Sequence, residues 1–299
     1  MENRSKFYID GVWSQPNSGA TMPVLNPATE RQVGVVALGN AADVDAAVAA
    51  ASRAFASYSQ TTKAERLVFL GRLLKVTEAR FEDLAQAMSM EMGAPISMAR
   101  DAHADAAVGH LQGFIEALGQ LQERESLTSG DIQLREPIGV CGLITPWNWP
   151  MNQIALKVIP ALATGCTCVL KPSEHTPISA MIYAEIVHEA GFPAGVFNLV
   201  QGDGPTVGAA MSRHCDIQMM SFTGSTRAGT AVTRDAADTV KRVTLELGGK
   251  SPNLVFADCD LQDRVTASVD ACLDYTGLSS DAPTRLLVER CRYDAVVAL

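Results

Sequence analysis

The stretch GVCGLITPWNWPMNQIALKVIPALATGCTCVLKPSEHTP, residues 139–177, decides the fold of this chain. GVCGLI (139–144) and CTCVLK (166–171) are apolar runs of strand length, and NQIALKVIPALATG between them predicts a helix that ends at Gly165. Thr176-Pro177 predicts the start of another helix, which stops at Gly191. Two strands joined through a helix are typical of a parallel β-α-β unit.

The same alternation continues towards the C-terminal end. It predicts strands at VFNLV (196–200), IQMMSF (217–222) and RVTLEL (242–247), and helices at TVGAAMSRH (206–214) and STRAGTAVTRDAAD (225–238). The fold class is therefore α/β, with a doubly wound, mostly parallel sheet. Ligands of such sheets bind at the carboxyl ends of the strands, so the loops after the strands are the candidate site.

The first eighty residues predict elements that pack on this sheet. FYIDGVWSQPNSG has aromatic and β-branched residues around Asp10-Gly11, which predicts a hairpin. An Ala-rich helix is expected after Asn40, and Thr62 with Glu65 three residues later forms a capping box at the start of a second helix.

Composition narrows the function class. The chain has 299 residues, 47% hydrophobic and 19% charged, which is a globular composition with room for more than one domain. Its net charge of -9 argues against nucleic acid or an anionic membrane as partner, because phosphate-rich surfaces need a basic footprint. The first residues lack an apolar secretory stretch, so we expect a cytoplasmic protein.

Cysteine and histidine give no cofactor pattern of their own. Seven cysteines in a chain of this size favour reduced thiols over disulfide bridges. Cys166 and Cys168 have the wrong spacing for a CxxC redox or zinc pair, and the alternation through CTCVL indicates a buried strand. The five histidines form no ligand pattern, so we expect no metal site.

Four loops follow the predicted strands, and each has a plain structural explanation as a packed turn or a solvated loop. Backbone N–H groups at a helix start, with the helix dipole behind them, also suit an anionic phosphate. Four such loops on one sheet edge favour a ligand site. They carry Asn148 in TPWNWP, Lys171 and Glu174 in KPSE, Gly202-Asp203-Gly204, and Thr223-Gly224-Ser225.

Two further segments contain groups that could react. Glu246 ends RVTLEL beside Gly248-Gly249 and is either a solvated carboxylate or, beside an apolar cleft, a general base. DYTGLSSDAPTR (274–285) resembles a catalytic loop in composition, but a serine hydroxyl is a poor nucleophile without a neighbouring base, and no histidine lies near this segment in the sequence.

Five of these segments together resemble the aldehyde dehydrogenase superfamily in order and spacing. They are TPWNWP (145–150), KPSEHTP (171–177), GDGPTVG (202–208), FTGSTRAG (222–229) and VTLELGGKSPNLVF (243–256), and the likeness runs from residue 6 to residue 299. It implies a Rossmann-like cofactor domain followed by an incomplete second α/β domain. It also implies oxidation of an aldehyde to a carboxylic acid with NAD or NADP, through a cysteine thiolate and a glutamate base.

The resemblance assigns roles by motif. Asn148 would be the side-chain donor of the oxyanion hole, and Glu246 the general base. Lys171 and Glu174 would hold the adenosine ribose; Glu174 favours NAD, whereas Lys171 leaves NADP open. The residues expected to contact the dinucleotide are Ile144, Thr145, Pro146, Trp147, Lys171, Ser173, Glu174, Gly204, Phe222, Thr223, Gly224, Ser225, Leu247 and Gly248.

The DYTGLSSDAPTR loop departs from the family pattern N-x-G-Q-x-C followed by x-A-x-x-R. Asp281 to Arg285 match the tail, which places Ser280 at the position of the nucleophilic cysteine and Leu278 at that of the glutamine. An alcohol ionises many pH units above a thiol, so we expect Ser280 to be close to inert. Cys272 and Cys291 lie too far along the chain to replace it and are predicted to be buried small residues.

Length is the second departure from the family. We expect a dinucleotide-binding domain at 1–113 and 137–248, a bridging and oligomerisation segment at 114–136, and a truncated start of the catalytic domain at 249–299. SPNLVF (251–256) is expected to be a strand without neighbours. The resemblance implies homo-oligomers, and we expect this chain to lack the C-terminal strand that the family uses in oligomerisation.

Two functional hypotheses follow. The chain is either an NAD(P)-dependent oxidoreductase acting on a small-molecule aldehyde, or a catalytically inactive NAD(P)-binding pseudoenzyme or partial gene product. The cysteine replaced by Ser280 separates the two, because the family reaction needs a readily ionised nucleophile.

Overall fold

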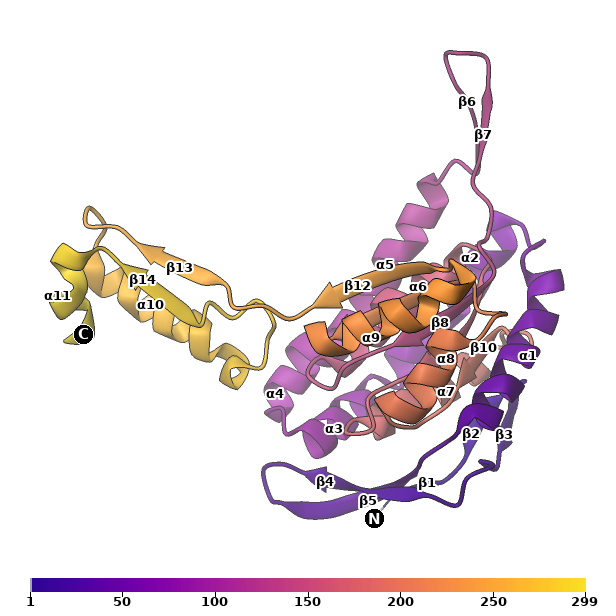
Figure 1. Cartoon of the computed structure of the whole chain (residues 1–299), viewed down its shortest axis with the longest axis horizontal. Helices are drawn as coiled ribbons and strands as arrows, with labels where there is room; N and C mark the ends of the chain where they lie inside the picture. The colour runs from indigo at the N-terminus through magenta and orange to yellow at the C-terminus, as the bar shows by residue number, and fades with distance from the viewer. Residues whose placement is uncertain (1) are drawn as a thin grey trace. The chain divides into compact units, whose positions relative to one another are not determined.

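The computed structural model describes residues 2–299 and divides the chain into two compact units, residues 1–245 and residues 246–299. The predicted doubly wound sheet is present in the first unit (Figure 1). The second unit is smaller and contains a two-stranded parallel sheet.

A seven-stranded sheet forms the centre of the first unit, in the order β12-β11-β8-β9-β10-β2-β3. The pairs β11–β8, β8–β9 and β9–β10 are parallel, and the hairpin β2–β3 extends the sheet in antiparallel fashion beyond β10. The strands are β2 (Phe7–Ile9), β3 (Val12–Ser14), β8 (Val140–Ile144), β9 (Thr167–Lys171), β10 (Phe197–Leu199), β11 (Met219–Gly224) and β12 (Arg242–Leu247).

Helices cover both faces of this sheet because its central strands are apolar on both sides. Val140, Ile144 and Val169 belong to a core cluster with residues of α1 (Ala41–Tyr58), α8 (Ala209–Arg213) and α9 (Thr226–Ala236). Side chains alternate along a strand, so Cys141 and Cys168 point to the other face. That face packs against α6 (Pro150–Ala163) and α7 (Pro177–Glu189).

An outer layer of helices packs on α6 and α7. It consists of α2 (Lys63–Ala79), α3 (Phe81–Met92), α4 (Ile96–Met98) and α5 (Asp105–Gln120), with a π-helical turn η1 (Ala99–Ala104) between α4 and α5. The predicted capping box of Thr62 and Glu65 is confirmed, and Asn40 caps α1 through its side chain. The hairpin turn at Asp10-Gly11 is also confirmed, with φ of 55° and 78°.

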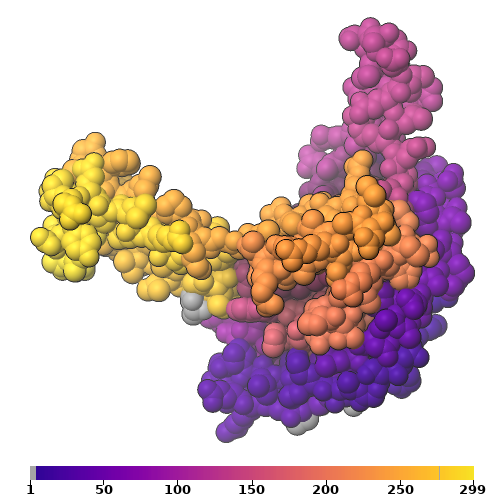
Figure 2. Space-filling model, in the orientation of Figure 1, coloured from indigo at the N-terminus to yellow at the C-terminus, as the bar shows by residue number. Residues whose placement is uncertain are grey.

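Two smaller sheets complete the first unit. β1 (Glu2–Arg4), β5 (Arg31–Ala37) and β4 (Thr21–Asn26) form one of them. β6 (Arg124–Ser126) and β7 (Ile132–Leu134) form a hairpin that projects from the unit (Figure 1; Figure 2). Among the described residues, no helix is both long and apolar enough to cross a bilayer.

The segment directly after β10, where a single helix over residues 206–214 was expected, forms two successive elements. A π-helical turn η2 (Gly204–Gly208) precedes α8, and a 3-10 turn η3 (Ala237–Thr239) follows α9. The carboxylate of Asp203 accepts a hydrogen bond from the Thr206 amide at 2.7 Å, which fixes the start of η2. The wider turn places Gly204 on the exposed side and Gly208 in the interior.

The second unit is a small β-α-β arrangement. Its core consists of Val255, Val265 and Val296. The expectation that SPNLVF lacks neighbours was wrong, because β13 (Pro252–Val255) pairs in parallel with β14 (Arg285–Val288) across α10 (Leu261–Leu273). Cys291 is exposed and Cys272 half-buried, so the prediction of two buried thiols was wrong as well. The remaining elements are η4 (Asp274–Gly277), η5 (Arg290–Arg292) and α11 (Tyr293–Val297).

Candidate functional site

The strand order creates one point where the chain changes direction across the sheet. β8, β9 and β10 follow one another to one side, and the chain then crosses back to place β11 on the other side of β8. Ligands of open α/β sheets bind in the crevice outside the carboxyl ends of the strands at such a switch point. The carboxyl ends of β8, β9 and β11 carry Thr145, Lys171 and Thr223, all of which sequence reasoning placed in the site.

Lys171 is a buried cation, 3% exposed, at the end of β9. Its Nζ donates to the carbonyls of Pro172 and Gly202 at 2.8 and 2.7 Å and pairs with Glu174 Oε2 at 3.3 Å. Burial lowers the pKa of Lys171, and the Glu174 carboxylate opposes that shift. Lys171 and Glu174 therefore form a pre-positioned ion pair beside the switch point.

Two threonine hydroxyls at this edge have no hydrogen-bond partner among the described residues. Thr145 Oγ1 follows β8 and Thr223 Oγ1 lies near the end of β11, and both atoms are buried. Ile144 and Phe222 are paired residues of the two parallel strands, so the threonines come next on neighbouring strands. A buried hydroxyl without a partner costs about 1–3 kcal/mol, so a polar ligand at this edge would remove a penalty that the fold carries.

Glycines in the loops of the site let neighbouring residues pack closely against the backbone or leave the backbone accessible. Gly202 has φ of 156°, and a Cβ there would lie 2.3 Å from Val207 Cγ2, so a side chain is excluded. A Cβ on Gly224 would lie 2.6 Å from Phe222 Cζ, so the Phe222 ring lies against the bare backbone. Among the described residues, none has an atom within 4 Å of a Cβ placed on Gly204, so the backbone of η2 is open to approach.

The N-terminus of α9 points its amides towards this edge. Ser225 is the N-cap residue, and its side chain accepts a hydrogen bond from the Ala228 amide at 3.2 Å. The other first-turn amides of an eleven-residue helix have no intrahelical acceptor, and the helix dipole adds partial positive charge there. An anionic group of a ligand is favoured at such a position.

An aromatic stack supports the TPWNWP turn between β8 and α6. The Trp149 ring lies on the buried His103 ring with centroids 4.2 Å apart, and burial lowers the pKa of His103 to about 4. Trp147 is 43% exposed and Asn148 is half-buried beside it. Sequence reasoning missed His103, because the π-helical turn that presents it leaves no signal in the spacing of residues.

The remaining expected residues divide between the two units. Ile144 and Ser173 are buried and Pro146 half-buried in the first unit. Four others belong to the second unit: Glu246, Leu247 and Gly248 are exposed at and after the end of β12, and Ser280 is exposed in the turn before β14. Next to Ser280, the Ser279 hydroxyl donates to Asp281 Oδ1 at 2.5 Å.

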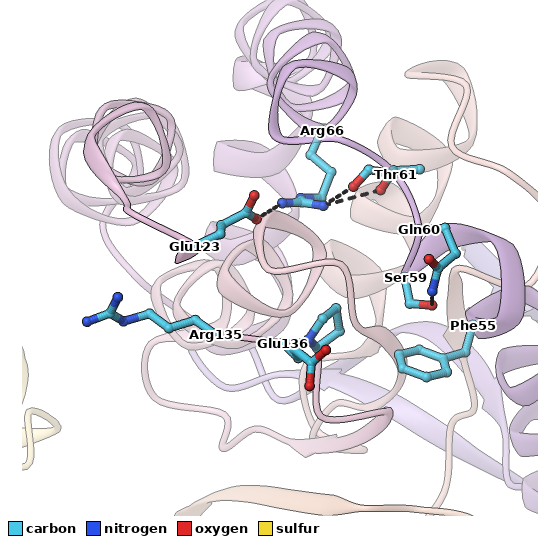
Figure 3. Close-up of a pocket in the computed structure, with 9 residues that line it drawn as sticks. Phe55, Ser59, Gln60, Thr61, Arg66, Glu123, Arg135 and Glu136 are labelled. Carbon is cyan, nitrogen blue, oxygen red and sulfur yellow. Dashed lines mark hydrogen bonds and ion pairs between the residues drawn. The ribbon is translucent and has the colours of Figure 1, made fainter. Parts of the chain in front are cut away.

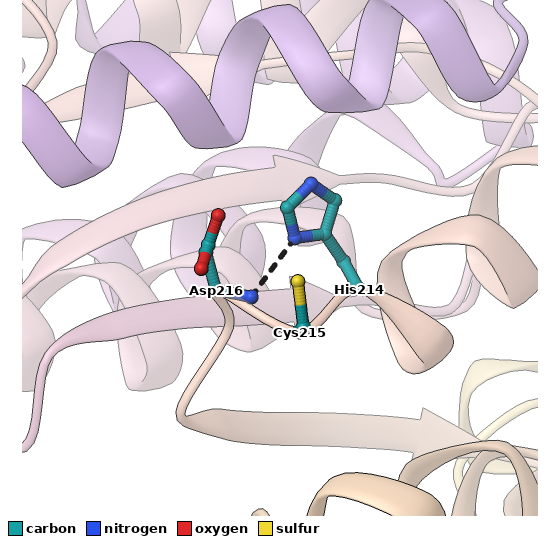
Figure 4. A group of neighbouring side chains, drawn as sticks. All are labelled: His214, Cys215 and Asp216. Carbon is teal, nitrogen blue, oxygen red and sulfur yellow. Dashed lines mark hydrogen bonds between the residues drawn. The ribbon is translucent and has the colours of Figure 1, made fainter.

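A second group of potential ligands lies on the turn between α8 and β11 (Figure 4). Donor atoms of His214, Cys215 and Asp216 lie within 4.8 Å of one another. However, His214 Nδ1 accepts a hydrogen bond from the Asp216 amide at 3.1 Å, which occupies its lone pair. Lys241 Nζ donates to the His214 carbonyl, so a positive charge is already present. Both features disfavour a bound cation.

Comparison with known proteins identifies relatives over the whole chain. The model of the aldehyde dehydrogenase family matches residues 13–299. A 3-succinoylsemialdehyde-pyridine dehydrogenase of Pseudomonas sp is 50% identical over 297 residues, which are 99% of this chain and 62% of that protein.

Solved structures agree with this. An aldehyde dehydrogenase from Bartonella henselae has a TM-score of 0.96 and 48% identity, covering 100% of this chain and 63% of that one. A mutant of aldehyde dehydrogenase C from Pseudomonas syringae, in complex with NAD+ and octanal, has a TM-score of 0.95 and 52% identity. The match covers 98% of this chain and 60% of that one. The chain thus spans about three fifths of the length of these relatives.

Proposed function

The chain belongs to the aldehyde dehydrogenase family, and we propose that its first unit binds NAD(P) across the carboxyl ends of β8, β9 and β11. The buried hydroxyls of Thr145 and Thr223, unpartnered within the described part of the chain, carry this proposal because they lie on adjacent strands at the switch point. They match a ligand with many hydrogen-bonding groups. We extend this dinucleotide domain over residues 1–113 and 137–248, with 114–136 as a bridging and oligomerisation segment and 249–299 as the start of a catalytic domain.

The ribose end of the ligand is assigned to Lys171 and Glu174. Glu174 Oε2 accepts hydrogen bonds, which suits ribose hydroxyls, and its charge repels a phosphate at the same place. Lys171 faces the carboxylate at 3.3 Å and donates to two backbone carbonyls, so its charge is already neutralised. The pair therefore favours NAD over NADP, with Ser173 next in the same loop.

The diphosphate end is assigned to the N-terminus of α9. Gly224 and Ser225 present amides there, and the backbone at Gly204 is open, since no atom in the described part of the chain would lie within 4 Å of a Cβ at that position. The apolar residues Ile144, Pro146, Trp147 and Phe222 complete the wall on this unit. Leu247, the last residue of β12, and Gly248 after it are further proposed contacts of the dinucleotide.

For the aldehyde dehydrogenase family we propose oxidation of a small-molecule aldehyde, for which NAD would supply the hydride acceptor. Asn148 would donate to the carbonyl oxygen, and Glu246 would accept a proton from water. Ser280 takes the place of the nucleophile, and the serine hydroxyl lacks the acidity that a cysteine thiol brings to this step. We propose that this chain binds NAD while oxidising aldehydes only at a trace rate.

Titration of the purified chain with NAD, followed by tryptophan fluorescence, tests the binding proposal. We expect saturable quenching, because Trp147 is 43% exposed in the site wall. In Trp147→Phe the fluorescence change should shrink while calorimetry still records binding. Absence of binding by both methods at millimolar NAD would contradict the proposal.

Addition of propanal to the NAD-saturated chain tests the catalytic part. We expect NADH absorbance to stay at the background rate. Steady NADH formation by the wild-type chain would contradict the assignment of Ser280 as an inert nucleophile. Ser280→Cys, measured in parallel, isolates the thiol from every other difference from the relatives.

A further inference from the structure

A polar cavity of about 410 Å³ lies in the first unit, at the base of the β6–β7 hairpin (Figure 3). Glu123 lines it just before β6, and residues 135–137 line it just after β7. The other wall comes from Phe55 of α1, from the turn 59–61, and from Arg66 in the first turn of α2. The described residues that line this cavity all differ from those assigned to the dinucleotide, so it is a separate candidate site.

The buried cation of the cavity, Arg66, is neutralised within the fold. Its side chain is 3% exposed, and its Nε donates a hydrogen bond to the Ala163 carbonyl at 2.8 Å. Its Nη1 donates to the Thr61 carbonyl, and its Nη2 pairs with the Glu123 carboxylate. Because the opposite charges of Arg66 and Glu123 are in contact, this wall attracts an anionic ligand only weakly.

The second cation of the lining, Arg135, is matched in the same way. Its Nη1 donates to the Gln122 carbonyl at 2.7 Å, and its Nη2 pairs with Glu125 Oε2 at 3.1 Å. Figure 3 shows its guanidinium pointing away from the Glu136 carboxylate. Each positive charge of the lining therefore has its own carboxylate, and Glu136 is left over.

Glu136 is exposed, and its carboxylate has no hydrogen-bond or ion-pair partner among the described residues. Two further acceptors of the lining are unused within that part of the chain. Glu123 accepts from Arg66 through Oε1, which leaves Oε2. Gln60 donates through Nε2 to Ser59 Oγ at 3.3 Å, which leaves Oε1. The cavity thus presents one net negative charge and more acceptors than donors.

A primary ammonium group complements this lining, because it carries a positive charge, three N–H donors and no acceptor. The side chains of Phe55 and Pro137 add apolar surface for an attached alkyl chain, and an aromatic ring also attracts a cation. A divalent metal ion fits less well, since Ca²⁺ takes about six to eight oxygen ligands. We propose that this cavity binds a primary alkylammonium group, with the charge at Glu136 and the alkyl chain against Phe55.

Saturation-transfer difference NMR on the full chain tests the proposal with n-butylamine. This amine is protonated at pH 7, because alkylammonium groups such as that of lysine ionise at about pH 10.4. We expect a saturable signal from its alkyl protons. 1-Butanol keeps the chain without the charge, and tetramethylammonium keeps the charge without N–H donors, so each should bind at least about threefold more weakly. Equal binding of all three compounds would overturn the proposal.

The same ammonium group is present on free amines and on the lysine side chains of other proteins, and a second probe distinguishes the two sources. Nα-acetyl-lysine methylamide carries the group on a peptide-like backbone. If it binds more tightly than n-butylamine, a protein lysine is the natural occupant; if it binds more weakly, a free amine is. Failure of both probes to bind at tens of millimolar would overturn the proposal.

Two glutamate variants test the place of the charge. Glu136→Gln keeps the size of an exposed side chain and removes its charge, so the dissociation constant for n-butylamine should rise at least about threefold. Glu116→Gln removes the same charge from an exposed position of α5 outside the cavity and should leave the dissociation constant unchanged. Equal losses of affinity in the two variants would show general attraction to an acidic chain and would refute a site at Glu136.

A third variant tests the place of the alkyl chain. Phe55→Ala removes the ring from the cavity wall, so it should weaken the binding of n-butylamine by a larger factor than that of methylamine, which has no chain to lose the contact. Equal factors for the two amines would overturn the contact with Phe55. The comparison of n-butylamine with 1-butanol on the wild-type chain decides the proposal even if this variant does not fold.

Discussion

Replacing the two unpartnered threonines by valine should make the chain more stable and a poorer binder of NAD. Thr145 and Thr223 each bury a hydroxyl that no group among the described residues satisfies, and valine has almost the same shape without the oxygen. A buried, unsatisfied hydroxyl costs about 1–3 kcal/mol, so each substitution should raise the free energy of unfolding by about 1 kcal/mol. This expected gain in stability is unusual, because most substitutions of buried residues lower the free energy of unfolding.

The loss of affinity follows from the same oxygen atoms. A net hydrogen bond to a ligand contributes about 0.5–1.5 kcal/mol, so each variant should raise the Kd for NAD by about two- to tenfold. Urea denaturation followed by circular dichroism measures the stability, and calorimetry measures the affinity. The double variant should combine both effects, since the two hydroxyls lie on separate strands.

Thr167→Val is the matched control. Thr167 is fully buried at the start of β9, but its Oγ1 donates to the Ala51 carbonyl at 3.0 Å. The same substitution should therefore destabilise the chain by about 1 kcal/mol and leave NAD binding unchanged. If all three variants lost stability alike, the hydroxyls of Thr145 and Thr223 would be satisfied within the fold, and their part in the binding proposal would be refuted.

Three further outcomes are expected. Glu91 is 3% exposed, and its carboxylate accepts hydrogen bonds from the Ile178 amide at 2.5 Å and the Ser179 amide at 3.0 Å. Glu91→Ala should therefore lower the free energy of unfolding, measured in urea, by about 3–5 kcal/mol. Glu82 is an exposed residue of the same helix, and Glu82→Ala should leave the urea midpoint nearly unchanged. Burial lowers the pKa of His103 from 6.5 to about 4, so between these values the unfolded chain binds a proton at His103 that the folded chain does not. The free energy of unfolding should therefore fall by about 2 kcal/mol from about pH 7.5 to about pH 5, and His103→Phe should abolish that part of the decline. Val240 has φ of 51° and is 89% exposed, so Val240→Asn should raise the melting temperature, and an unchanged value would show that the turn is unstrained.

Local signals explain why the sheet was predictable from the sequence. Apolar runs of strand length alternate with helical segments, and Gly165 and Gly191 end α6 and α7 where left-handed φ values of 83° and 76° require glycine. Thr145, Lys171 and Thr223 were found because they directly follow or end predicted strands. Position along the chain was enough to place them on one edge.

What the sequence did not predict depends on contacts between distant residues. The missing partners of Thr145 and Thr223 become apparent only when every described donor and acceptor around them is known. β14 was missed because RLLV is a short run in a polar region and becomes a strand by pairing with β13.

Lys171 connects two loops through hydrogen bonds, so the loops cannot move independently of each other. Its ammonium joins the carbonyl of Pro172, after β9, to that of Gly202, after β10. The recognition surface is thereby assembled in advance, and an arriving nucleotide has no loop to reorder. Stopped-flow mixing should accordingly give a single exponential whose rate rises linearly with nucleotide concentration, without the plateau that a slow rearrangement imposes.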